Sequence, residues 1–167
     1  ESVVNTGDDK ISDIKNILGL KRFPEDLELV RFAAQEYFIC FCVAVMPTFI
    51  PTKFHCLLAD KLQKAYEDIA RGKDVRLIIA CPPQIGKSTM VSELFPAWVM
   101  GNQPWPVICA SYGASLAERK SQNTRDIVST DMYKYIFPSS RLNPDSTSKE
   151  YWQTKNKASY KAIGVGG

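Results

Sequence analysis

Apolar residues recur with a period close to 3.6 over the first 72 residues, which predicts a helical N-terminal region. A short amphipathic helix is expected near residues 11–18. A second helix is expected to begin at Pro24 and to run to about Met46, before a proline-containing loop. A third helix ends at Gly72, and its apolar stripe consists of Phe54, Leu57, Leu58, Leu62, Ala65, Tyr66 and Ile69.

After Gly72 the pattern changes to short apolar runs separated by helix breakers. Residues 77–80 are apolar without polar alternation, which predicts a strand buried on both faces of a parallel sheet. A second such run at 107–110 follows a predicted helix, so the two runs are expected to form a right-handed β-α-β unit. The other expected elements are a helix over about 114–129, a turn or two at 132–137, a loop over 138–148 and a hairpin of 151–154 with 159–163.

The segment 76–89 reads RLIIACPPQIGKST and has the residue order of a phosphate-binding loop. Gly86 allows close backbone approach, Lys87 can neutralise phosphate charge and Ser88 offers a hydroxyl to Mg²⁺. Because the two prolines have no N–H, the backbone donors must follow them at the start of the helix. The predicted phosphate-binding residues are Gln84, Ile85, Gly86, Lys87, Ser88 and Thr89, with Lys87 also the catalytic residue and Ser88 the magnesium ligand.

The strict form of this motif requires a glycine at position 81, where the chain has Cys81. The triplet Gly-Lys-Ser alone is weak, since chance places a Gly-Lys-Ser/Thr triplet in somewhat under about one chain in ten of this length. The predicted strand before it and the predicted helix after it supply the context that the motif needs. The alternative is an ordinary strand-to-helix turn.

Composition and charge exclude few classes of protein. With 167 residues, 45% of them hydrophobic and 23% charged, the chain has the size and balance of one globular domain. A net charge of +3 is compatible with a polyanionic partner without requiring one. The five cysteines form no C-x-x-C pair, which argues against a zinc site or a disulfide framework and favours a reducing compartment.

The apolar run 37–46 is shorter than the ~20 residues of a membrane span, so a buried helix is expected. Without an initiator Met or a signal pattern, the sequence is expected to start within a longer or processed protein.

Several further motifs follow the loop in a fixed order. They are FPAW at 95–98, ICASYGASLA at 108–117, an aromatic-proline pair at 137–138, Trp152 within a strand, and a closing GVGG. Together with CPPQIGKS they resemble the N-terminal ATPase region of the large terminase subunits of tailed phages, over residues 51–167. The resemblance implies an α/β P-loop NTPase fold, a Rossmann-like parallel sheet flanked by helices. Residues 1–50 are then an N-terminal helical segment, and 51–167 are a partial ATPase domain that stops before the Walker B strand.

The resemblance also implies a function. Members of the family use ATP and Mg²⁺ to drive double-stranded DNA into a procapsid, together with a portal protein, a small terminase subunit and a homo-oligomeric ring. It implies the host cytoplasm and, transiently, the procapsid portal, with neither secretion nor membrane attachment. Gln84 stands where the family often has arginine, and the Walker B and nuclease acids are absent from the sequence, so little hydrolysis is expected of this chain alone. The alternatives are another P-loop enzyme, of the helicase or kinase kind, and a non-catalytic assembly or binding module.

Two further groups of residues are candidates by the same resemblance. Pro51, Phe54 and His55 precede the third helix and would lie near adenine, although His55 is more readily explained as a surface residue. The basic residues of the helix over 114–129 would contact DNA or a neighbouring subunit, and their ordinary explanation is a solvated helix face. These basic residues are Arg119, Lys120 and Arg125.

Overall fold

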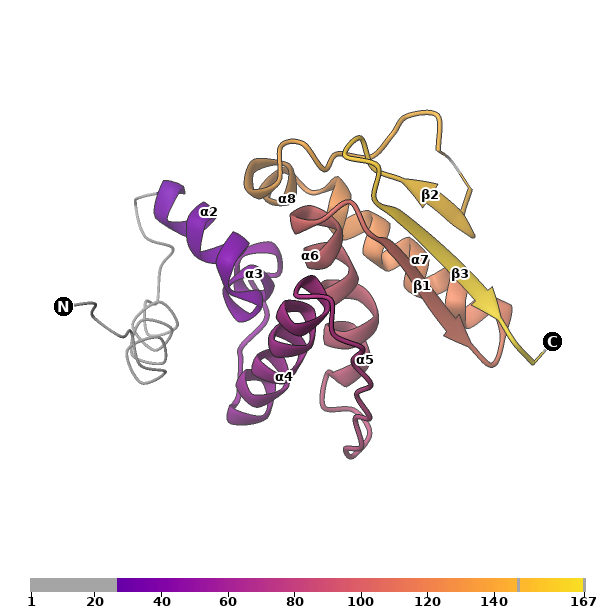
Figure 1. The fold of residues 1–167 in the computed structure, drawn as a ribbon, viewed down its shortest axis with the longest axis horizontal. Helices are drawn as coiled ribbons and strands as arrows, with labels where there is room; N and C mark the ends of the chain where they lie inside the picture. The colour runs from indigo at the N-terminus through magenta and orange to yellow at the C-terminus, as the bar shows by residue number, and fades with distance from the viewer. Residues whose placement is uncertain (1–26, 147, 167) are drawn as a thin grey trace.

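Helices flank a small three-stranded sheet in the computed structural model, which describes residues 27–146 and 148–166 (Figure 1). The short helix expected near residues 11–18 and the predicted helix start at Pro24 lie outside these ranges. The elements are α2 Leu27–Glu36, α3 Phe38–Val45, α4 Lys53–Ala70, α5 Lys87–Thr89, η1 Met90–Leu94, α6 Phe95–Asn102, β1 Pro106–Ser111, α7 Ala114–Ser129, α8 Asp131–Ile136, β2 Tyr151–Gln153 and β3 Ser159–Gly164.

The sheet has the order β1-β3-β2, with β1 and β3 parallel and β2 and β3 antiparallel. The strand predicted at 107–110 and the predicted hairpin are therefore confirmed, and the sheet is mixed rather than wholly parallel. Trp152 and Tyr160 stack at 5.4 Å between ring centroids on its buried face. The Trp152 indole N–H donates to Ser121 Oγ of α7 at 2.9 Å, which ties α7 to the hairpin.

The strand predicted at residues 77–80 is wrong, because this segment joins no β-ladder. Ile78 is 93% exposed rather than buried on two faces. The predicted β-α-β pairing of 77–80 with 107–110 is absent as well, and the parallel partner of β1 is β3. An apolar run shows that side chains favour burial, but a strand also needs a neighbour that offers backbone donors and acceptors.

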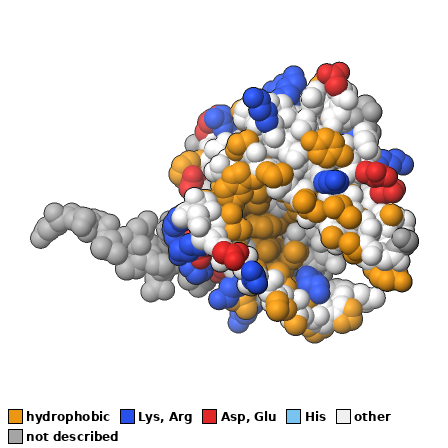
Figure 2. Space-filling view, turned by 45° about the vertical axis from the view of Figure 1, so that its right-hand side comes forward, with side chains coloured by type: hydrophobic (Ala, Val, Ile, Leu, Met, Phe, Trp, Pro, Cys, Tyr) orange, Lys and Arg blue, Asp and Glu red, His pale blue; other side chains and the backbone are white. Residues whose placement is uncertain are grey.

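An apolar groove of about 820 Å³ runs beside β1, which is an edge strand of the sheet. Its walls come from α4, η1, α6 and β1 and include Tyr66, Val91, Phe95, Trp105 and Ile108. Figure 2 shows hydrophobic side chains gathered in such a hollow. Ile108 on β1 remains 64% exposed, so this side of the sheet carries apolar surface that no described helix covers.

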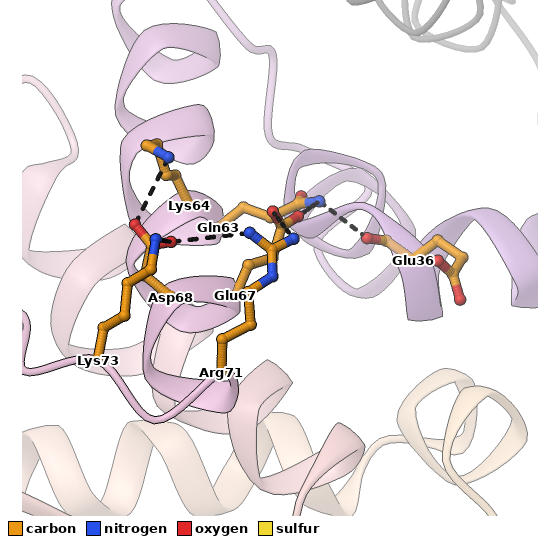
Figure 3. A network of polar contacts seen from close by, with 7 residues as sticks. All are labelled: Glu36, Gln63, Lys64, Glu67, Asp68, Arg71 and Lys73. Atoms are coloured by element: carbon orange, nitrogen blue, oxygen red, sulfur yellow. Dashed lines mark hydrogen bonds and ion pairs between the residues drawn. The ribbon is translucent and has the colours of Figure 1, made fainter. Parts of the chain in front are cut away.

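The helix predicted to run without interruption to Met46 is instead broken at Tyr37, where φ is −118° and ψ is 118°. Gln63 of α4 satisfies both backbone groups that the break exposes. Its side chain donates to the Glu36 carbonyl at 3.1 Å (Figure 3) and accepts from the Phe38 N–H at 3.0 Å. The break therefore depends on a contact from a distant helix, which local periodicity does not reveal.

The helix after the loop continues from Lys87 to Asn102 but widens into a π-turn, in which the Phe95 N–H donates to the Met90 carbonyl. Pro96 follows at once and has no N–H to donate to the Ser92 carbonyl one turn earlier. The Tyr160 hydroxyl takes its place and donates to that carbonyl at 3.4 Å. The Thr124 hydroxyl lies at the same distance but donates its single hydrogen to the nearer Lys120 carbonyl, at 2.9 Å. Burial raises the pKa of Tyr160, which keeps its hydroxyl protonated as a donor.

The core lies where α3 packs against α4, α6 and α8. The predicted burial of the apolar run 37–46 is confirmed, because most of α3 is inaccessible to solvent. Trp98 of α6 is 1% exposed, contacts the ring of Phe38 and donates its indole N–H to the Ala34 carbonyl at 2.9 Å. Among the described residues, no helix is both long and apolar enough to span a membrane.

Asp68, near the end of α4, should make stability depend on pH. Lys73 donates to its carboxylate at 2.8 Å and Lys64 lies at 3.5 Å (Figure 3), and the Lys73 hydrogen bond holds the pKa of Asp68 below its ordinary value. A lowered native pKa stabilises the fold above the unfolded-state pKa, and this stabilisation is lost as pH falls through the native pKa. Asp68→Asn should therefore lower the Tm slightly at pH 7, and the difference should shrink at an acidic pH that protonates wild-type Asp68. Thermal melts at both pH values test this, and an equal Tm difference at both would contradict it.

Candidate phosphate-binding loop

The loop between residues 82 and 87 joins the extended segment after α4 to the long helix that begins at Lys87. Gly86 has φ +81° and ψ 1°, in the left-handed region that glycine adopts without steric cost. Gln84 also has a positive φ, of 62°, which is uncommon for a residue with a Cβ. Left-handed residues at both positions bend the chain tightly just before the helix.

This backbone geometry favours anion binding. A left-handed residue followed by a right-handed one turns successive N–H groups into a concavity, and Gly86 followed by the helical Lys87 has that arrangement. The N–H groups of Gly86, Lys87 and Ser88 contribute to it. Within the described part of the chain, none of the three donates to another group. They are therefore available to oxygen atoms of a ligand such as a phosphate.

The side chains of Lys87 and Ser88 are both accessible to solvent. Lys87 is half-buried and has no ion-pair partner among the described residues, so its ammonium group can meet a phosphate. Ser88 is exposed. In residues 27–146 and 148–166, no cluster of three or more His, Cys, Asp or Glu side chains forms a ready metal site. A Mg²⁺ ion would thus depend on Ser88 together with nucleotide oxygens and water.

A pocket of about 600 Å³ adjoins the loop. It brings two of the predicted adenine-site residues, Phe54 and His55, together with Gln84, Ile85 and Gly86 of the loop. Pro51, the third, does not line it. The remaining lining residues are Met46, Thr48, Phe49, Ile50, Thr52 and Thr89. Aromatic and aliphatic walls beside a set of backbone donors suit a flat base joined to a phosphate chain.

His55 has a larger role in this site than the sequence suggests. It is half-buried, and its ring packs against Phe49 with centroids 5.0 Å apart. One ring nitrogen contacts Thr52 at the start of α4, and the other contacts the Ile85 carbonyl at 2.9 Å. The signal in the sequence was a threonine followed three residues later by a side chain able to complete a capping box, here with His in place of Glu or Gln.

The three basic residues of α7 do not form one surface. Arg119 is exposed, and Arg125 donates to the Ser146 carbonyl at 3.3 Å. Lys120 points inward and pairs with Glu93 of η1 at 2.6 Å. A DNA contact by Lys120 would have to break that pair, so Arg119 is the most accessible of the three.

Glu93 and Lys120 form a pair that the sequence did not single out. The Glu93 side chain is 8% exposed and also accepts from Asn123 Nδ2 at 3.1 Å. A buried carboxylate needs such partners, because an unpaired charge is costly away from water. The pair fixes the π-turn of the loop helix against α7.

No family model, curated protein or solved structure matches this chain.

Proposed function

We propose that this chain is the ATP-binding part of a viral DNA-packaging motor, with a P-loop NTPase fold and Mg·ATP as its ligand. The observation that carries the proposal is the left-handed turn at Gly86. The turn brings three backbone N–H groups, unpaired among the described residues, and the Lys87 side chain together in sequence, and its Gly86 lines a pocket of about 600 Å³ that Lys87 and Ser88 themselves do not line. Phosphate recognition by a nest of N–H groups with an adjacent cation is the chemistry of P-loop proteins.

The roles follow from the positions. The N–H groups of Gly86, Lys87 and Ser88 would hold the phosphates, the Lys87 ammonium would neutralise them, and the Ser88 hydroxyl would bind Mg²⁺. Phe54 and the neighbouring pocket walls would receive the base. The described residues nearest the loop offer no carboxylate pair that could position a water molecule and the metal together, so binding is proposed here without efficient hydrolysis.

The packaging role, with double-stranded DNA, a portal protein and a small terminase subunit as partners in a homo-oligomeric ring, rests on the order of sequence motifs. Two of these motifs lie on elements that contact the helix following the loop. FPAW at 95–98 begins α6 immediately after the π-turn of the loop helix, and ICASYGASLA at 108–117 runs through β1 into α7. In such a motor the loop helix would transmit the state of the nucleotide to α7 through the Glu93–Lys120 pair.

Calorimetric titration with Mg·ATP tests the binding part of this proposal. The expected result is saturable binding at micromolar to millimolar nucleotide, with Mg·ADP competing for the same site. No heat at millimolar nucleotide would remove nucleotide binding and, with it, the motor.

Titration with duplex DNA separates a motor from other P-loop enzymes. A translocating ATPase should bind a duplex of random sequence at low salt, with affinity that falls steeply as salt increases. Arg119→Ala should weaken this binding more than Lys120→Ala does, because only Arg119 is exposed. Nucleotide binding without any duplex binding would favour an enzyme of another kind.

A further inference from the structure

His55 connects the start of α4 to the candidate phosphate-binding loop. Its Nδ1 lies 3.0 Å from the Thr52 backbone N and 2.9 Å from Thr52 Oγ1, while its Nε2 lies 2.9 Å from the Ile85 carbonyl oxygen. A backbone N–H can only donate, so Nδ1 must be the acceptor in the first contact. The neutral ring then carries its hydrogen on Nε2 and donates it to Ile85.

The bond to Ile85 sets the direction of the next peptide N–H. The Ile85 carbonyl and the Gly86 N–H belong to one planar trans peptide and therefore point in opposite directions. With the carbonyl held toward His55, the Gly86 N–H must point away from the imidazole ring. A 180° flip of this peptide would replace the Gly86 N–H by a carbonyl oxygen on the side where the proposed phosphate would bind, and it would break the concavity.

Close contact between His55 and Gly86 restricts the orientation of the imidazole ring beside the loop. A Cβ placed on Gly86 would lie 3.0 Å from His55 Nε2, so the imidazole packs directly against the left-handed turn. The ring also makes edge contacts with Phe49 and Phe54, with centroids 5.0 and 5.6 Å away. The ring therefore has a fixed orientation before any ligand arrives.

We infer that His55 is a positioning residue, which holds the Ile85–Gly86 peptide in the orientation that binds phosphate and joins the base pocket to the loop. The inference rests on the proposed nucleotide binding. His55 acts here through the backbone of the loop. Its conformational role does not require contact with the phosphates.

Two substitutions of similar shape test the contacts of the two ring nitrogens of His55 separately. Gln places an amide N–H near the position of Nε2, so His55→Gln should keep the bond to Ile85. Asn places its polar atoms near the position of Nδ1. His55→Asn should therefore keep the contact with Thr52 but lose the hydrogen bond to the Ile85 carbonyl of the loop. The dissociation constant for Mg·ATP should stay within about threefold of wild type for His55→Gln. For His55→Asn it should rise about tenfold, because one hydrogen bond is lost. Equal affinities for the two variants would overturn the inference.

Nitrogen-15 NMR without nucleotide gives a readout that does not depend on binding. The wild-type imidazole should show the Nε2–H tautomer. The backbone amide resonance of Gly86 should differ between the two variants, since both lose the ring current of the imidazole but only His55→Asn loses the bond to Ile85. The Nδ1–H tautomer, or identical Gly86 resonances in both variants, would refute the positioning role. If wild type binds no nucleotide while these resonances behave as expected, the proposed function fails and the structural role of His55 stands.

Discussion

Replacing Lys87 with alanine should weaken Mg·ATP binding by about ten- to a hundredfold, the range expected for the loss of a charge-assisted hydrogen bond. The physical reason is that Lys87 is the first residue of the loop helix and carries one of the three N–H groups of the turn, so the account places its ammonium group on the phosphates. It has no ion-pair partner in the described ranges, so its removal should leave the fold intact. Isothermal titration calorimetry measures the affinity, and the Tm reports on the fold.

Lys155→Ala provides a matched control, because it removes the same charge from an exposed hairpin turn. Its affinity for Mg·ATP should equal that of wild type within about twofold, since charges separated by more than a Debye length are screened. If Lys87→Ala bound the nucleotide as tightly as this control, Lys87 would have no place in the site.

Trp98→Ala should lower the free energy of unfolding by about 3–5 kcal/mol, the usual cost of truncating a large buried aromatic residue. Trp98 is 1% exposed, and its ring packs against Tyr66 of α4 and Phe38 of α3, with centroids 4.7 and 5.6 Å away. Single domains are stable by only about 5–15 kcal/mol, so the variant should be partly unfolded or close to it. Urea denaturation measured by circular dichroism gives the value.

Trp98→Phe separates the contribution of ring packing from that of the indole hydrogen bond. Phenylalanine keeps most of the aromatic contacts but leaves the Ala34 carbonyl without its 2.9 Å donor, which costs about 1–3 kcal/mol. A loss below about 1 kcal/mol for Trp98→Ala would show that α6 does not pack on α3 and α4 in the way described.

The helices of this chain were largely predictable because each carries its own signal. The apolar stripe of α4 ends at Gly72, whose φ of +79° is the left-handed conformation expected after a helix. The predicted range 114–129 coincides with α7, and the hairpin follows from two apolar runs around a polar turn. These are local patterns, in which neighbouring residues determine the outcome.

The errors arose where the outcome depends on distant parts of the chain. The run 77–80 has the composition of a buried strand, yet pairing requires another strand beside it, and among the described residues β1 pairs with β3 and not with this run. The break at Tyr37 depends on the side chain of Gln63 on another helix. The local periodicity of apolar residues reveals neither of these two outcomes.

Some features of the candidate site could be expected from the sequence, and others could not. Residues 84–89 were singled out because the motif lists them in order, and the structure shows Gly86 in the left-handed region, which glycine adopts without steric cost. The link from His55 to Ile85 spans 30 positions in the sequence and depends on how α4 packs beside the loop. The inward orientation of Lys120 likewise depends on its partner Glu93.

The most direct test of the central claim, phosphate binding by the turn at Gly86, is an NMR titration of the nitrogen-15-labelled protein with Mg·ATP. The account predicts that the backbone amide resonances of Gly86, Lys87 and Ser88 shift most, since these N–H groups change from unpaired donors to donors to phosphate. Resonances of the distant hairpin residues 155–157 should stay in place. Saturable nucleotide binding that leaves the three loop amides unmoved would contradict the account.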